Sequence, residues 1–212
     1  MKSKKIPFAA LAVLTVFSAG CASSSSRDKA GKTSTSLHEA AVNIDKGEVQ
    51  IDAALLALSD LVNTPNPNIK PQFNEFESSV EKLEALSKDV SKQALAMQSQ
   101  GAAYFQQWDA DLAKIRNEDI RSRSAERKNV VAARFERVRT SYVEAKDAFV
   151  PFMSRLTDVR TALSVDLTGE GLASVKAVAN KAKSDAVPLR EALRQLSSDF
   201  RSLGLSLAPS SN

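Results

Sequence analysis

Cysteine and histidine are almost absent from this sequence. Among its 212 residues there is one cysteine, Cys21, and one histidine, His38. A single cysteine excludes an intramolecular disulfide and a Cys-x-x-Cys motif. Zinc sites need several ligands, so a lone histidine predicts a surface or helix-capping residue rather than a metal site. We expect no metal and no cofactor.

Glycine-rich catalytic motifs are absent as well. The chain has 7 glycines, and none of them forms a nucleophile elbow or a Walker loop. Gly169-Glu170-Gly171 follows a predicted helix rather than a strand, which indicates a turn and not a dinucleotide-binding loop. The carboxylates are spread over predicted outer helix faces, where charges normally face water. We therefore expect no enzyme activity and no small-molecule substrate.

Aromatic residues make up only 6% of the chain, whereas alanine and leucine are frequent, which favours helices. The formal net charge is +4, from 29 basic and 25 acidic residues. Three of the lysines lie in an N-terminal segment that we expect to be removed, so the 26 remaining basic residues nearly balance the acidic ones. A nearly neutral body gives no argument for nucleic-acid binding.

The N-terminus has the pattern of a bacterial lipoprotein signal. Lysines at positions 2, 4 and 5 precede an apolar stretch of 14 residues at 6–19, which is shorter than the roughly 20 residues that span a bilayer. Ala19-Gly20-Cys21 then resembles a lipobox, with Ser18 at the position where leucine is usual. We predict that residues 1–20 are cleaved and that Cys21 becomes the first residue.

The chemistry of lipid attachment requires Cys21. Its thiolate is the nucleophile that accepts a diacylglyceryl group, and cleavage frees its amine for a further acyl chain such as palmitate. Because Ala22 is not aspartate, the protein resembles lipoproteins that are sent to the outer membrane. We expect a lipid-anchored envelope protein on the periplasmic face of that membrane. Two alternatives are ordinary secretion with a cut after Ala22 and an uncleaved membrane anchor.

The rest of the chain changes character at Leu37. Residues 21–36 comprise Cys21 and a serine-rich stretch without apolar periodicity, which predicts a disordered linker. From Leu37, apolar residues recur at alternating steps of four and three, a period of about 3.5 residues that is typical of helical bundles. We call this apolar stripe the seam of each helix. In the first helix only Glu48 interrupts it.

Four helices follow from these seams. The first ends before the prolines and asparagines of residues 63–68, and the second begins near Pro71. Prolines 151 and 188 should kink the third and fourth helices, and Gly204 should cap the last one. Short connections make neighbouring helices antiparallel. We predict an all-α, four-helix antiparallel bundle over residues 37–207, followed by a polar tail at 208–212.

One point of topology stays open. Between residues 116 and 129 apolar residues are rare, and the seam resumes out of phase at Val131. We interpret residues 116–124 as the tip of a central hairpin that projects beyond the shorter first and fourth helices. Because this tip contains no glycine or proline, the alternative is one continuous helix over residues 71–165, a rod of roughly 140 Å.

Basic residues gather around the predicted tip. Residues 114–139 carry nine lysines or arginines against four acidic residues, a net of +5. Such a surface can bind an anionic envelope component, such as glycolipid phosphates or peptidoglycan carboxylates. The alternative, which we favour, is a solvated helix end with internal ion pairs. The candidate anion-binding residues are Arg121, Arg123, Arg127, Lys128 and Arg134.

A family resemblance rests on residues between Trp108 and Leu167. They are Trp108 with Asp111-Leu112, Arg121, Ser124, the basic run to Arg139, Pro151, and Leu156 with Asp158. Through these residues the chain resembles a family of uncharacterised bacterial lipoproteins, the domain of unknown function 2959. The resemblance implies a helical envelope protein without a known activity, and no catalytic residue follows from it.

The sequence thus leaves two functions to test. The first is a structural or adaptor lipoprotein, anchored through Cys21, whose helices bind other envelope proteins or a second copy of the chain. The second is a binding module for an anionic envelope component through the basic tip. An enzyme is the least favoured class.

Overall fold

The computed structural model describes the backbone of residues 26–208 and the side chains from residue 33 onward. The predicted signal peptide, Cys21 and residues 209–212 lie outside this part. Within it the regular secondary structure is all helical, without a strand, and short turns join the helices. None of these helices is long and apolar enough to cross a membrane. The helices are α1 (Ser26–Asn63), α2 (Lys70–Leu112), α3 (Glu118–Val165) and α4 (Gly169–Leu207).

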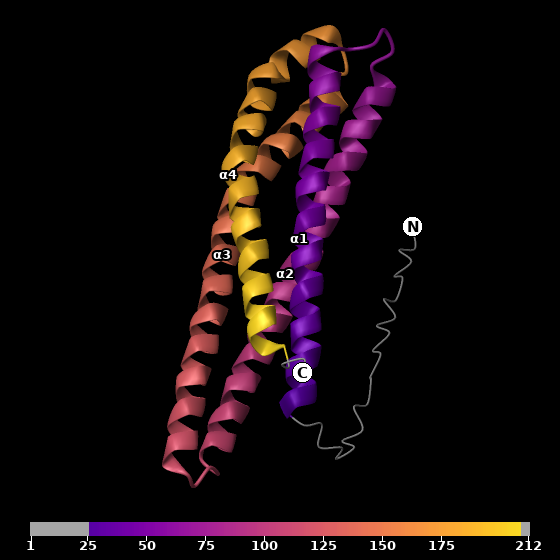
Figure 1. Ribbon diagram of the computed structural model, residues 1–212. Helices are drawn as coiled ribbons and strands as arrows, with labels where there is room; N and C mark the ends of the chain where they lie inside the picture. Colours follow the sequence, from indigo (N-terminus) through magenta and orange to yellow (C-terminus); the bar gives the residue numbers. More distant parts are fainter. Residues whose placement is uncertain (1–25, 209–212) are drawn as a thin grey trace, which may run out of the picture.

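The helices form an antiparallel bundle (Figure 1). Each one contacts two others, in the order α1–α2–α3–α4 and back to α1, and the contacts of α4 with α1 and α3 are the most extensive. The α2–α3 turn lies beyond the start of α1 and the end of α4 (Figure 1). The predicted all-α bundle is confirmed, and a hairpin rather than a continuous rod connects α2 to α3.

Local sequence signals explain where the helices begin. The Asn117 side chain accepts a hydrogen bond from the backbone N–H of Ile120, and the Thr168 hydroxyl accepts one from Gly171 N–H, so both residues are N-caps. Pro71 lies in the first turn of α2, where its missing N–H costs nothing. Acidic residues follow Asn117 and Thr168, and they interact favourably with the positive helix N-termini.

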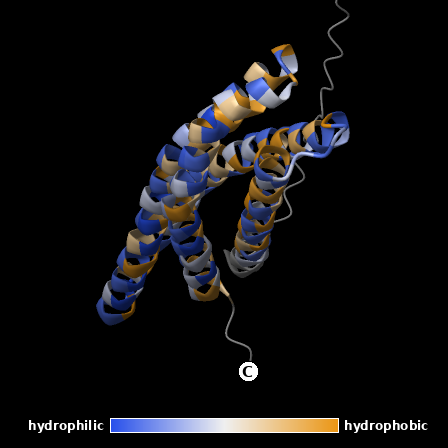
Figure 2. Ribbon diagram, turned by 90° about the horizontal axis from the view of Figure 1, so that it is seen from above, coloured by the Kyte–Doolittle hydropathy of each residue, from blue (hydrophilic) through white to orange (hydrophobic). Residues whose placement is uncertain are grey.

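The bundle has two hydrophobic clusters, one above the other in the orientation of Figure 1. The upper core includes Phe76 and Phe152, which have no exposed surface. The lower core is formed mainly by α1, α3 and α4, with Leu37 and Leu196 among its buried residues. Hydrophobic and hydrophilic residues alternate along every helix (Figure 2), as expected when each helix buries one stripe.

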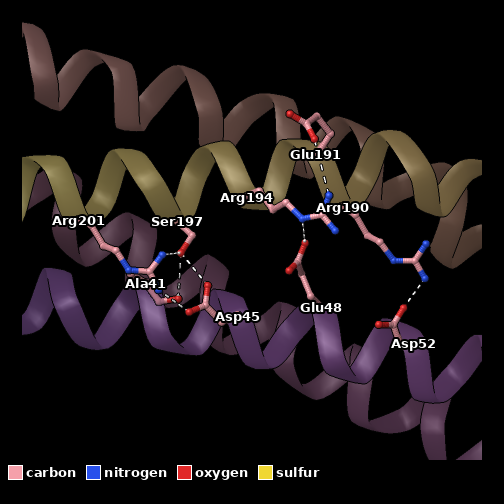
Figure 3. A network of polar contacts seen from close by, with 9 residues as sticks. All are labelled: Ala41, Asp45, Glu48, Asp52, Arg190, Glu191, Arg194, Ser197 and Arg201. Carbon is pink, nitrogen blue, oxygen red and sulfur yellow. Dashed lines mark hydrogen bonds and ion pairs between the residues drawn. The ribbon is translucent and has the colours of Figure 1, made fainter.

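Ion pairs also connect helices α1 and α4. Asp45, Glu48 and Asp52 on α1 pair with arginines of α4 (Figure 3). Glu48 interrupts the apolar seam, and its Oε1 lies 3.1 Å from Arg194 Nε. Because every pair lies partly in water, each contributes little alone, about 0–1 kcal/mol.

Three predicted boundaries were wrong. Residues 26–36, assigned to a linker, are helical, and the Ser34 hydroxyl donates a hydrogen bond to the Gly204 carbonyl at 2.9 Å. Gly204 is not a C-cap, because α4 continues to Leu207 and Gly204 is buried against α1. The turn between the long helices spans residues 113–117 rather than 116–124, because Asn117 starts α3.

Candidate functional site

The lower half of α2 is packed less tightly than its upper half. Its buried residues run from Phe73 to Leu83 and stop there, although its seam continues to Trp108. Val80 has no exposed surface, whereas Val90, three seam positions further along α2, is half-buried. The seam of α2 therefore enters the bundle fully only in the upper core, and several cavities lie along its lower half, two of which share lining residues.

The first cavity lies between α1 and α2, and we call it the inner cavity. It has a volume of about 260 Å³. Leu37 and Ile44 of α1 face Val90 and Met97 of α2 across it, and Phe200 of α4 also lines it. Its lining contains no lysine or arginine.

The second cavity lies on the α2–α3 hairpin, and we call it the arm cleft. The arm is the part of this hairpin at residues 104–127; Arg127 donates a hydrogen bond to the carbonyl of Ser206, close to the end of α4. The arm cleft has a volume of about 660 Å³. Like the inner cavity it has no basic residue in its lining, and Thr33 and Gln100 line both cavities. The lining of the arm cleft comprises Thr33, Gln100, Ala103, Tyr104, Gln107, Trp108, Asp111, Leu112, Ile115 and Ser124.

Aromatic rings hold the arm together. The Tyr104 ring lies edge-on to Trp108, with ring centroids 5.5 Å apart, and Phe105 packs edge-on to Phe135 of α3 at 5.9 Å. Gly101 is needed here, because a Cβ atom at this position would overlap the Phe135 ring. The arm is thus a close α2–α3 pair whose outer aromatic surface is half-exposed.

Two polar features belong to this aromatic cluster. The Trp108 indole N–H donates a hydrogen bond to the Ser124 hydroxyl at 3.2 Å, which connects α2 to α3. Burial raises the pKa of Tyr104 above its ordinary value of 10.0, while the positive charge of Arg127 acts in the opposite direction. The phenol is therefore neutral at physiological pH, and the cleft surface that it lines is uncharged at that position.

Most of the candidate anion-binding residues have partners within the chain. Arg121 pairs with Glu118, and Lys128 pairs with Asp109 across the hairpin. Arg127 and Arg134 donate to backbone carbonyls near the end of α4, the latter to Ser202 at 3.0 Å. Arg123 has no such contact with the described residues. The five side chains lie on one hairpin, but they do not converge on a common point.

The remaining predicted site residues are Cys21 and His38. Cys21, the lipidation candidate, lies outside the described residues. His38 is exposed on α1, and the described residues contain no group of His, Cys, Asp or Glu that could hold a metal ion. Sequence reasoning missed both cavities, because the periodicity of α2 gives no sign of where its neighbours move away. It also missed the Asn117 cap, which Asn followed by Glu118-Asp119 does signal.

Comparison with known proteins gives one match. Residues 28–199 match the family described as "Protein of unknown function (DUF2959)". No curated protein and no solved structure matches the chain.

Proposed function

This chain belongs to the DUF2959 family of proteins of unknown function, and we propose that it is a lipid-anchored structural or adaptor protein of the bacterial cell envelope. In this proposal Cys21 carries the lipid, and the periplasmic face of the outer membrane is the location. The helical body binds another envelope protein or a second copy of the chain. The proposal assigns the protein no catalytic role.

The observation that carries the adaptor role is the half-exposed seam of the arm. In the upper core the four helices cover most of each other's seams, and Phe152 and Leu156 have no exposed surface. In the arm, Tyr104, Phe105 and Trp108 are each only half-buried. Aromatic residues of this kind are enriched at protein interfaces. A partner helix laid against the arm would supply the cover that α1 and α4 supply elsewhere.

The internal pairing of the basic residues supports the adaptor over the anion-binding alternative. Carboxylates already neutralise Arg121 and Lys128, and carbonyl groups orient Arg127 and Arg134 toward α4. An anionic glycolipid would have to compete with these contacts. Six of the nine basic residues in 114–139 have such partners in the described part of the chain, which leaves Arg116, Arg123 and Arg137 for a polyanionic surface.

Site-specific photocrosslinking in living cells tests the adaptor role. A photoreactive amino acid at Phe105 or Leu112 of the arm should give an adduct with another protein. Matched control sites are Leu56 and Val187 of the upper bundle, whose side chains are 64% and 65% exposed. These controls are more exposed than the arm sites, so random collisions would favour them. Adducts at the control sites only, or at all four sites equally, would contradict the proposal.

The anchor is tested separately. Intact mass spectrometry of the membrane-extracted protein should find fatty acids on Cys21 and no residues before it. Cys21→Ser should move the protein from the membrane fraction to the soluble fraction. Retention of the Cys21→Ser protein on membranes would contradict the lipid anchor, whatever the crosslinking result.

A further inference from the structure

We propose that an acyl chain on Cys21 folds back into the arm cleft and the inner cavity while the protein is outside a membrane. This inference rests on the lipid anchor of the proposed function and concerns the same half-exposed surface. In this inference the acyl chain covers the half-exposed surface of the arm, and insertion of the chain into a membrane uncovers that surface. Partner binding at the arm would then be confined to the membrane-inserted protein.

Position along the chain is the first argument. Helix α1 begins at Ser26, only five residues after Cys21, and five residues reach at most about 18 Å. Thr33, about 10 Å further along the helix axis, already lines both cavities. The first turns of α1 lie at the same end of the bundle as the arm (Figure 1). A lipid attached to Cys21 can therefore reach the cavities.

The shape of the cavities selects a thin occupant. A helix with its side chains is about 10–12 Å across. It can lie over the open arm cleft, but it cannot enter the inner cavity of about 260 Å³ without moving α1 away from α2. A flexible hydrocarbon chain can follow both cavities, which adjoin at Thr33 and Gln100. The inner cavity thus favours an acyl chain over a protein segment.

The chemistry of the linings favours the chain of a lipid over its headgroup. Neither lining contains a lysine or arginine that could bind a phosphate. Aliphatic and aromatic groups such as Ile44, Met97 and Trp108 form much of the two linings, beside polar and acidic groups that include Glu39 and Asp111. Each methylene that such a surface removes from water contributes about 0.8 kcal/mol. An acyl chain in water would therefore enter the cavities. A bilayer would compete for the chain, because it also removes the methylenes from water.

Trp108 provides the test, because it is the only tryptophan in the chain and it lines the arm cleft. Full-length lipidated protein and the Cys21→Ser variant are compared in vesicle-free buffer. The expected result is emission at shorter wavelength and weaker acrylamide quenching for the lipidated protein. Vesicles of phosphatidylethanolamine and phosphatidylglycerol should abolish this difference, because the acyl chain moves into the bilayer.

A matched pair of substitutions locates the effect. Both alanines are exposed, but only Ala103 lines the arm cleft, so Ala103→Phe obstructs the cleft and Ala102→Phe changes the preceding residue outside it. Each is compared with its own Cys21→Ser counterpart, so direct effects of the new ring cancel. The difference between lipidated and unlipidated protein should disappear in Ala103→Phe and persist in Ala102→Phe.

Several outcomes would overturn the inference. One is equal quenching of the lipidated and Cys21→Ser proteins in vesicle-free buffer. Another is protection that appears only at concentrations where sedimentation detects dimers, which would make a second copy the occupant. Quenching of Trp108 in the Cys21→Ser protein by brominated phospholipid vesicles would make a membrane lipid the occupant. If mass spectrometry finds no fatty acid, the proposed function fails as well; if it finds one and Trp108 stays exposed, only this inference fails.

Discussion

The same substitution at two positions of α2 tests whether its lower half is loosely packed. Val80→Ala and Val90→Ala each remove two methyl groups from a seam position that the sequence pattern treats as equivalent. Val80 has no exposed surface and belongs to the upper core. Val90 is half-buried and faces the inner cavity. The structure therefore predicts different costs for two changes that sequence periodicity cannot distinguish.

The magnitudes follow from the burial of each side chain. Two methyl groups at about 0.8 kcal/mol each, plus a term for the new cavity, give about 1.5–2.5 kcal/mol for Val80→Ala. Val90 already borders empty space and keeps part of its surface in water, so its loss costs less than about 1 kcal/mol. Alanine is the better helix former by up to about 0.7 kcal/mol. That gain is common to both variants, so it cancels in the comparison.

Urea denaturation measures the two free energies of unfolding, with circular dichroism and Trp108 fluorescence as independent probes. Coincident transitions by both probes are required before the values are compared. We expect Val80→Ala to lower the free energy of unfolding by about 1 kcal/mol more than Val90→Ala, by the burial argument above. Equal costs at the two positions would refute the packing difference between the upper and lower halves of α2.

Three further predictions test separate features. Asn117→Ala removes the α3 N-cap and should lower the free energy of unfolding by about 1 kcal/mol, measured by urea denaturation; no change would show that the cap does not stabilise α3. Because the folded-state pKa of Tyr104 is raised, its stabilising effect is present below pH 10.0 and is lost as the pH rises through that higher value. The melting temperature should therefore decline less steeply above this pH in Tyr104→Phe, and parallel profiles would contradict this. Charge reversal of Arg121, Arg123 and Arg127 together should leave crosslinked partners and membrane localisation unchanged, whereas loss of glycolipid or peptidoglycan binding would favour the anion-binding alternative.

Much of the fold could be predicted because seam periodicity directly reflects burial. The third helix shows this best, since Val138, Phe152 and Leu163 were seam residues and all three are buried. The start of α1 could not be predicted from the same signal. Residues 26–36 lack an apolar pattern, and the Ser34 contact with Gly204, 170 residues away in the sequence, accompanies the helix there. Long-range contacts of this kind have no local signature.

The candidate site was less accessible to sequence reasoning. The aromatic residues Tyr104 and Trp108 fit core positions by spacing, and they do lie on the inner side of α2. Whether such a position is sealed or half-open depends on how far the neighbouring helices extend. Asp109, which neutralises Lys128, is on the other helix of the hairpin, so the internal pairing of the basic tip also needed three-dimensional information.

The contact between α1 and α4 has a consequence for the order of folding. Helix α1 packs more extensively against α4, the last helix to be synthesised, than against its neighbour α2. A chain threaded through a narrow export channel with its N-terminus first cannot close this interface until nearly all of it has emerged. Contacts of such long sequence separation also form slowly. In the proposed export to the periplasm, this late closure would keep the polypeptide extended during its passage, and the bundle would form only afterwards.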